Sequence, residues 1–218
     1  MDANNGNERQ EMQTLKVDVA VIGAGTAGLV AYRAAVAQGA RVGCMPSKLL
    51  IAAAEAAHML DAAGEFGVHA GETSIDGVAV MERVRRERDR FVGFVLDGVD
   101  SIPAGDKLRG HARFTGPHTL VVDDGAGKVS EVEAARIVIA TGSTPTHLPK
   151  LENVGPGVIT SDAVFYWQDL PRSVAVIGSG VIGLELGQAL ARLGVRVSVY
   201  ARGGSVAQLT DPVVLRNA

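Results

Sequence analysis

The chain has 218 residues, of which 47% are hydrophobic and only 4% aromatic, so its core must consist mainly of Ala, Val, Leu and Ile. The formal net charge of −3 gives no electrostatic case for binding nucleic acid or an anionic membrane. The polar start lacks the apolar region of a signal peptide, no apolar run is long enough to span a membrane, and one cysteine excludes a disulfide framework. We therefore expect a cytoplasmic protein.

The first part of the chain has the pattern of a strand, a turn and a helix. Residues 1–13 are polar and predict a disordered tail. The β-branched segment 17–22 is typical of a buried parallel strand, and an Ala-rich helix is expected over 26–38 with Gly39 as its stop. Arg41-Val42 begins a second strand, which breaks off into Gly43-Cys44-Met45-Pro46-Ser47-Lys48.

Two helices are predicted next. The first covers 47–63, with Ser47 as its N-cap and Gly64 as its terminator. The second covers 78–99, and its apolar face is expected to consist of Met81, Val84, Phe91, Val95 and Val99. We interpret the charged run 82–90 within it as a solvated helix face.

After residue 106 the apolar period changes to two, which predicts strands. The strands are expected at 108–114, 119–122, 129–132 and 135–140. A connector over 148–171 contains Phe165-Tyr166-Trp167, which we interpret as a packing cluster rather than a cofactor platform. A second unit then opens with a strand at 173–177, a helix ending at Arg192 and a strand at 196–200.

Two Gly-rich turns, 23–28 and 178–183, each follow a strand and open a helix. Each has the GxGxxG pattern, in which the glycines permit a tight turn, close approach of a pyrophosphate and close helix packing. The helix N-terminus then offers N–H groups to the phosphates. One such pattern is weak, but two copies 155 positions apart predict dinucleotide binding.

In proteins with this pattern, an acidic residue about 20 residues further on binds the ribose of the dinucleotide. The place 18 residues beyond Gly28 holds Pro46, so this acid is missing from the first unit. The second unit has Ala201 followed by Arg202. An arginine there can accept a 2′-phosphate, which makes NADP at least as suitable as NAD, with a surface arginine as an equal alternative.

These parts in this order resemble the FAD-dependent pyridine nucleotide-disulfide oxidoreductases, the family of dihydrolipoamide dehydrogenase, mercuric reductase and glutathione reductase. The most specific elements are Gly43–Lys48, Ala140-Thr141-Gly142-Ser143 and the second GxGxxG followed by Glu185. The resemblance implies an α/β fold with FAD- and NAD(P)-binding three-layer Rossmann-like domains, each a parallel sheet with helices, and a small antiparallel β-meander. It implies an FAD-binding domain over 14–167 and the first part of an incomplete NAD(P)-binding domain over 168–218.

The resemblance also implies a role for each matching residue. Cys44 corresponds to the flavin-proximal cysteine of a redox disulfide, Lys48 to a residue near the flavin N5, and Glu185 to its partner. The FAD contacts implied are Gly23, Gly25, Gly28, Lys48, Ala112, Thr141, Gly142 and Ser143. The nicotinamide dinucleotide contacts implied are Gly178, Gly180, Val181, Ile182, Gly183, Glu185 and Arg202.

The chain departs from the family pattern at its redox center. On the order of 15 residues are expected to be missing between Val42 and Gly43, judged from where the ribose acid should fall. This gap would remove the second strand, the acid and the partner of Cys44, whose position is taken by Gly39. The C-terminal domain through which the family forms homodimers is also expected to be absent. None of the five histidines can be placed as its acid–base residue, and their spacing suits no metal site.

The sequence thus predicts an oxidoreductase of the type that passes electrons between NAD(P)H, FAD and a small-molecule or protein-bound disulfide or dithiol. A lone thiol cannot cycle through an intramolecular disulfide, so this chain is expected to be inactive in that turnover. The alternative is a non-catalytic dinucleotide-binding remnant of such an enzyme. A flavoenzyme without a redox disulfide would have no role for Gly43–Lys48. Loss of a central strand also predicts low stability.

Overall fold

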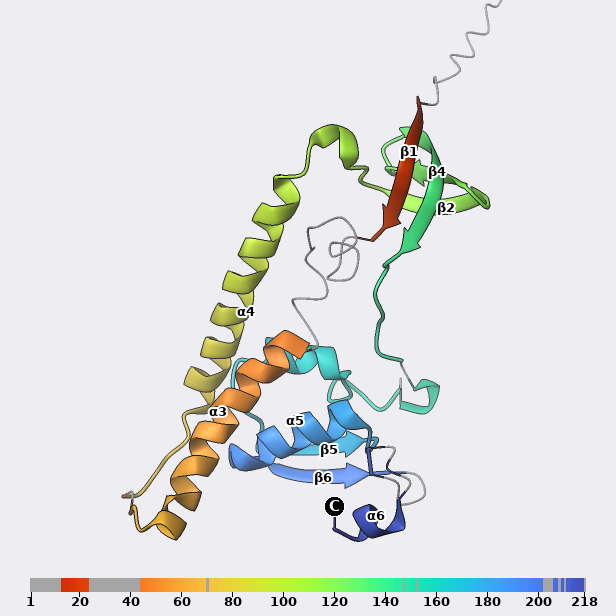
Figure 1. Ribbon diagram of the computed structural model, residues 1–218. Coiled ribbons are helices and arrows are strands. Elements are labelled where there is room, and N and C mark those ends of the chain that lie inside the picture. Colours follow the sequence, from red (N-terminus) through yellow and green to blue (C-terminus); the bar gives the residue numbers. More distant parts are fainter. Residues whose placement is uncertain are drawn as a thin grey trace, which may run out of the picture. The chain divides into compact units, whose positions relative to one another are not determined.

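The computed structural model describes residues 13–23, 44–69, 71–146, 148–151, 153–201, 206–207, 209 and 211–217 (Figure 1). The chain divides into two compact units, one formed by residues 1–37 and 94–142 and the other by 38–93 and 143–218. This division does not coincide with the domain boundary expected after residue 167. The reason is that residues 44–93 contribute to the same core as the second Gly-rich unit. Residues 1–12 of the predicted tail, the helix at 26–38 and the strand beginning at Arg41 lie outside the described residues, and Gln13 belongs to a strand instead of the tail.

The first unit is built on a four-stranded mixed sheet with the order β1-β4-β3-β2. Its strands are β1 (Gln13–Ile22), β2 (His111–Gly116), β3 (Thr119–Asp123) and β4 (Val129–Ile139). β1 and β4 are parallel, with Gln13 opposite Ser130 and Ile22 opposite Ile139, whereas β4-β3-β2 is an antiparallel meander. The combination of parallel pairing and a meander confirms the fold class predicted for this part.

β4 is one continuous strand, so the prediction of two strands at 129–132 and 135–140 was wrong. The gap expected at Glu133-Ala134 is not a break in the strand. β1 pairs along the whole length of β4, and Ala134 is buried beside the apolar core of this sheet. That core consists of Leu120, Val122 and Val132, with Leu15, Ala20, Ile22, Ala112 and Ile137 packed against it.

The second unit contains a parallel pair of strands and several helices. Its elements are α3 (Cys44–Ala62), the 3-10 turn η1 (Ala63–Phe66), the first part of α4 (Gly77–Asp100), η3 (Pro149–Leu151), η4 (Ser161–Tyr166), β5 (Ser173–Ile177), α5 (Val181–Arg192), β6 (Arg196–Tyr200) and α6 (Pro212–Asn217). α5 links β5 to β6 as predicted, and the two strands are parallel, with Ser173 opposite Arg196. The first unit contains the end of α4 and the short turn η2 (Ala104–Asp106).

The ends of α3 differ from the prediction. α3 begins at Cys44, so Ser47 lies inside the helix, where its hydroxyl donates to the Cys44 carbonyl at 2.9 Å instead of acting as an N-cap. Gly64 does not end the helical path, which continues through η1. The chain turns at Gly67, whose φ of 76° is readily adopted by glycine.

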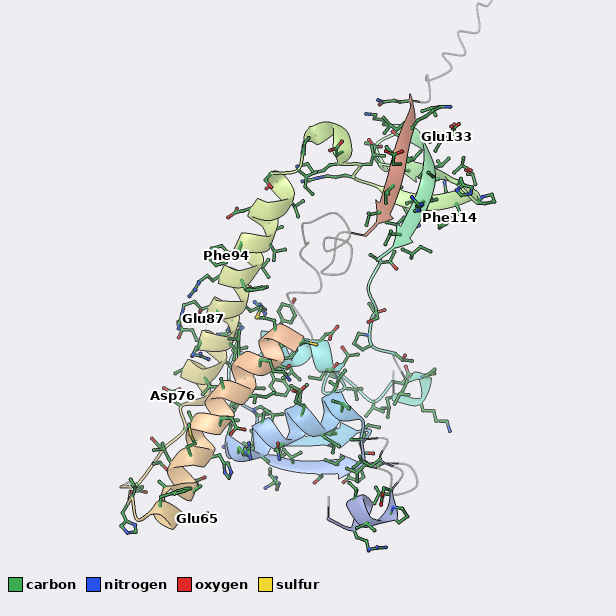
Figure 2. The ribbon with its side chains drawn as sticks, in the orientation of Figure 1. Glu65, Asp76, Glu87, Phe94, Phe114 and Glu133 are labelled. Carbon is green, nitrogen blue, oxygen red and sulfur yellow. The ribbon has the colours of Figure 1, made fainter. Side chains whose placement is uncertain are left out.

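α4 begins where Asp76 accepts a hydrogen bond from the Ala79 N–H at 2.9 Å, which is a regular N-cap (Figure 2). Met81, Val84 and Val92 are buried on its inner face. The prediction of Phe91 as a member of that face was wrong, because its side chain is 47% exposed. The buried place one turn before Val92 is taken by Arg88.

Arg88 is only 5% exposed, although it lies in the run that we interpreted as solvated. Its guanidinium donates to the Phe165 carbonyl at 2.8 Å and lies 4.7 Å from the center of the Tyr166 ring. Arg85 donates to the carbonyl of Trp167. These contacts attach α4 to η4. Phe165 is 1% exposed and Trp167 packs against the same core, which confirms the predicted packing cluster for these two residues, whereas Tyr166 is 49% exposed.

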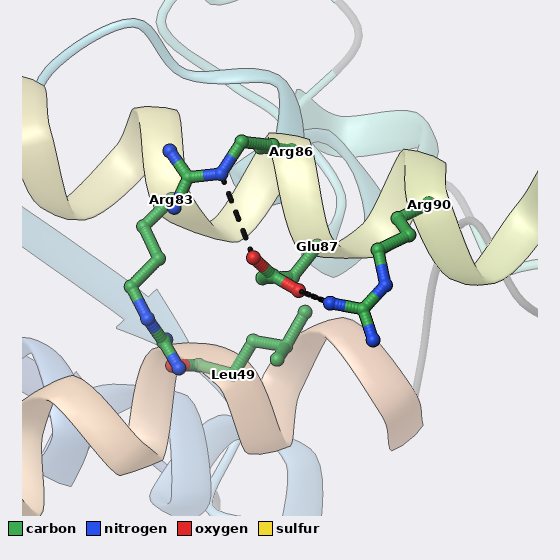
Figure 3. Close-up of polar contacts among 5 residues, drawn as sticks. All are labelled: Leu49, Arg83, Arg86, Glu87 and Arg90. Atoms are coloured by element: carbon green, nitrogen blue, oxygen red, sulfur yellow. Dashed lines mark hydrogen bonds and ion pairs between the residues drawn. The ribbon is translucent and has the colours of Figure 1, made fainter.

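The remaining charges of α4 follow the solvated pattern. Figure 3 shows Glu87 between Arg86 and Arg90, at 3.5 Å and 3.0 Å, and Arg83 donating to the Leu49 carbonyl at 3.3 Å. Arg86 and Arg90 are both mostly exposed, so these pairs contribute little to stability. The interpretation of a solvated face therefore holds for part of the run and fails at Arg85 and Arg88.

None of the described helices is long and apolar enough to cross a membrane. The cytoplasmic location stays a prediction.

Replacing Arg88 with Met should lower the free energy of unfolding by about 1–3 kcal/mol, because the buried Phe165 carbonyl would lose its donor. Urea denaturation followed by circular dichroism measures this. Arg90→Met is the matched control and should change stability by less than about 0.5 kcal/mol, since its ion pair is exposed. Equal effects of the two changes would contradict a structural role for Arg88.

Candidate nucleotide- and flavin-binding site

The first Gly-rich turn begins where β1 and β4 end side by side. The Ala140 N–H donates to the Ile22 carbonyl at 2.7 Å, which extends the parallel pairing by one bond. Gly23 has a φ of 102°, and a Cβ on it would lie 2.3 Å from the Ala140 carbonyl oxygen. Only glycine therefore fits at this position, as the first glycine of the pattern requires.

The structure thus brings Gly23 to the segment Ala140-Thr141-Gly142, two stretches predicted separately from the sequence. They meet at the carboxyl ends of two parallel strands, which is where α/β sheets bind ligands. Gly25 and Gly28 lie outside the described residues. Gly23, the residue of this turn that the structure describes, has the positive φ and the close backbone approach that the dinucleotide pattern requires.

Ala112 is not next to this turn. It lies in β2, at the other edge of the sheet from β1, paired with Val122 and packed beside the apolar core. If the Ala112 backbone contacts the adenine end of FAD, that end must lie away from the part of the ligand that the Gly23 turn binds. Ser143 belongs to the second unit, and its predicted role stays a prediction.

The second Gly-rich turn joins β5 to α5 in the predicted geometry. Gly178 has a φ of 117°, and its N–H donates to the Tyr200 carbonyl at the end of β6 at 2.8 Å. A Cβ on Gly183 would lie 2.5 Å from the Gly178 carbonyl oxygen, so the third glycine lets α5 pack close to the turn. A Cβ on Gly180 would meet nothing within 4 Å, which leaves open space where a ligand could approach.

The start of α5 fits a phosphate group. Gly180 is the N-cap residue and has no side chain with which to cap the helix. Val181 and Ile182 are 65% and 59% exposed, so the first turn of the helix is accessible. N–H groups and the helix dipole at such an end attract anions. Arg202, the predicted 2′-phosphate contact, lies outside the described residues.

Lys48 of α3 forms an ion pair with Glu185 of α5, which confirms the predicted pairing. The Lys48 side chain is 62% exposed and the Glu185 side chain 29% exposed, so the pair lies at the surface of the second unit. Cys44 is exposed and free, and it precedes Lys48 by four residues on the same helix. Residues at this spacing share a helix face, so thiol and ammonium lie on one side of α3.

Two polar pairs of this unit were missed from the sequence. Arg192 of α5 forms an ion pair with Glu55 of α3, and Arg88 holds the Phe165 carbonyl. The spacing contained a signal for the first, because Glu55 follows Lys48 by seven residues and Arg192 follows Glu185 by seven. The described residues contain no group of three or more His, Cys, Asp or Glu side chains that could hold a metal ion.

A strand–turn–helix unit with these glycines, as formed by β5 and α5, defines the class of dinucleotide-binding α/β proteins. The family model of the pyridine nucleotide-disulphide oxidoreductases matches residues 17–214 of the sequence, and the chain belongs to this family. The resemblance noted from the sequence is thereby confirmed. Members of the family use FAD and NAD(P)H.

Curated relatives agree with this assignment. The chain is 31% identical over 210 residues to a dihydrolipoyl dehydrogenase of Chlorobaculum parvum, covering 88% of this chain and 44% of the relative. It is 34% identical over 220 residues to a mercuric reductase of Acidithiobacillus ferrooxidans, covering 92% of this chain and 39% of that relative. It is 36% identical over 202 residues to a dihydrolipoyl dehydrogenase of Trypanosoma brucei brucei, covering 84% and 42%. The chain thus spans less than half the length of these relatives.

The fold is also similar to that of a solved structure, the Cu(II) complex of the HOCl-induced flavoprotein disulfide reductase RclA from Escherichia coli. The TM-score is 0.69 at 22% identity, covering 93% of this chain and 46% of the other.

Gly183→Ala should lower the free energy of unfolding by about 1–3 kcal/mol, because the added methyl group would overlap the Gly178 carbonyl. Gly180→Ala is the control: its φ of −72° suits alanine and the space is open, so only the poorer N-cap acts and stability should fall by less than about 1 kcal/mol. Urea unfolding of both variants measures the difference. A Gly183→Ala variant as stable as the parent would show that α5 does not pack against this turn.

Proposed function

We propose that this chain is a flavoprotein oxidoreductase of the type that passes electrons between NAD(P)H, FAD and a dithiol or disulfide. The observation that carries the proposal is the Lys48–Glu185 ion pair. It joins α3, the helix that begins at Cys44, to the helix of the second GxGxxG turn, and the family pattern is matched most specifically in these segments.

Each residue is proposed to keep the role implied by its position. Lys48 would orient the flavin ring and Glu185 would hold its ammonium in place, while Cys44 would lie on the same side of α3. The proposed FAD contacts are Gly23, Gly25, Gly28, Ala112, Thr141, Gly142 and Ser143. The proposed contacts to the nicotinamide dinucleotide are Gly178, Gly180, Val181, Ile182, Gly183 and Arg202. FAD, when bound, supplies the electron carrier between hydride donor and thiol.

We further propose that this chain does not complete the disulfide half of the reaction. Cys44 is the only cysteine in the sequence, and an intramolecular disulfide requires two. This observation favors the second candidate function, a dinucleotide-binding protein without disulfide turnover. The disulfide or dithiol substrate, homodimer formation and the split into an FAD domain over 14–167 and a nucleotide domain over 168–218 remain predictions.

Purified chain incubated with FAD and desalted should retain a yellow flavin absorption band, and NADPH added without oxygen should bleach it. Dihydrolipoamide with NAD⁺ should give no turnover above a blank. A flavin-free protein that still binds NADPH would support the dinucleotide-binding alternative. A protein that binds neither would overturn the proposal, and disulfide turnover by the chain alone would refute its predicted inactivity.

Gly180→Ala should weaken NADPH binding about tenfold or more while the fold persists, because its methyl group would occupy the space through which a pyrophosphate approaches the backbone. Fluorescence titration with NADPH measures this. Unchanged affinity would exclude this turn as the nucleotide site.

Arg202→Ala should weaken NADPH binding about tenfold, the loss expected for a charge-assisted hydrogen bond to phosphate, and leave NADH binding unchanged. The same titration with both nucleotides measures this. Equal losses of affinity for NADPH and NADH, or no loss for either, would show that Arg202 does not bind the 2′-phosphate.

A further inference from the structure

α3 and α5 are joined by two ion pairs, and these have the same offset in sequence. Lys48 pairs with Glu185 and Glu55 pairs with Arg192, and both pairs are separated by 137 residues. The charged residues are therefore seven apart on each helix, which is about two turns. Equal offsets require the two helices to run in the same direction through this contact, as Figure 1 shows for α3 and α5.

Between the two pairs lies an apolar seam. α3 contributes Leu50 and Ala54, which are 0% and 1% exposed, and α5 contributes Leu186, Ala189 and Leu190, all at most 6% exposed. Apolar contact has little direction, so the seam supplies attraction between the two helices. By itself it does not specify which charged residues lie opposite one another.

The charges supply the selection that the seam lacks. α3 has its cation first and its anion second, whereas α5 has its anion first and its cation second. A shift of two turns would place Glu55 against Glu185, and reversal of one helix would place Lys48 against Arg192. Like charges at such positions are unfavorable, so the charge order disfavors the wrong registers as well as favoring the right one.

We propose that Glu55 and Arg192 are positioning residues that fix the register of α3 on α5 and thereby hold Lys48 against Glu185. The side chains of Glu55 and Arg192 are 48% and 25% exposed, so their pair is accessible to substitution without opening the core. The proposal rests on the proposed function in one respect: a fixed Lys48 serves the chemistry only if Lys48 contacts the flavin.

The test uses a water-soluble carbodiimide, which couples an ammonium and a carboxylate in contact into an amide, with the products mapped by mass spectrometry. The flavin-free chain is used, so the result does not depend on cofactor binding. The Lys48–Glu185 product reports the register. The Lys16–Glu133 ion pair, at 2.9 Å within the first unit, provides an internal reference in the same molecule.

Glu55→Gln should lower the Lys48–Glu185 product about twofold relative to the reference product, the effect expected for loss of one exposed ion pair. Glu55→Lys, repelled by Arg192 and attracted to Glu185, should lower it about fivefold. Combining Glu55→Lys with Arg192→Glu should restore the product and create a new one between positions 55 and 192. Glu65→Lys, the same charge change in η1 beyond the seam, should have no effect (Figure 2).

A Lys48–Glu185 yield that stays at the parent value in both Glu55 variants would overturn the proposal, as would a double variant that fails to recover it. If Glu55→Lys fails to fold, the milder Glu55→Gln and the double variant still decide. Failure of the flavin and NADPH experiments with a normal cross-linking pattern would refute the proposed function and leave the positioning role standing.

Discussion

The packing of α3 against α5 is the contact on which the second unit depends. It joins the segment that starts at Cys44 to the helix of the second Gly-rich turn, and its buried seam belongs to the core that also contains Phe165 and Met81. Because the two helices run in the same direction, their N-termini point to the same side, where the positive ends of both helix dipoles reinforce each other. The Glu185 carboxylate and the Lys48 ammonium form their ion pair there.

A second constraint is the way α4 is attached to its own unit. A buried guanidinium is costly unless its donors are satisfied, and Arg88 satisfies them on a backbone carbonyl, an aspartate and an aromatic ring. The apolar residues Met81 and Val84 give α4 its attraction to the core, while Arg88 and Arg85 set which carbonyls it faces. Polar contacts to backbone carbonyls of the connector thus complement the apolar packing of this helix.

Much of the fold followed from pattern. The strands at 173–177 and 196–200, the helix that joins them and the helix over 78–99 were predicted within a residue or two, since each has a clear period and a glycine or aspartate at its ends. What failed depended on tertiary contacts. β4 continues through Glu133 and Ala134 because β1 pairs along it, and Arg88 is buried where a carbonyl and a ring face it. The periodicity of apolar residues in one sequence shows neither that β1 pairs with β4 nor that a carbonyl and a ring contact Arg88.

The candidate site shows the same division. The glycines at 23, 178 and 183 were predicted from spacing, and each is required by a close backbone approach or a positive φ. The Lys48–Glu185 pair came from the resemblance to the family. The Glu55–Arg192 pair was missed although its spacing repeats that of the first pair, because a repeat of seven on two separate helices gains meaning only when the helices are known to be neighbors.

The length of β4 has a consequence for how the chain folds during synthesis. β1 finds its partner more than a hundred residues later, since Gln13 lies opposite Ser130, and the segment between them contains α3, α4, β2 and β3. Closing so long a loop is slow, and β4, the strand that pairs with β1 among the described residues, emerges from the ribosome late. Similarly, α3 cannot form its packing contact with α5 until α5 has been synthesized. Each unit of this chain therefore remains open while part of the other is being made, a state in which chaperone binding would be most useful.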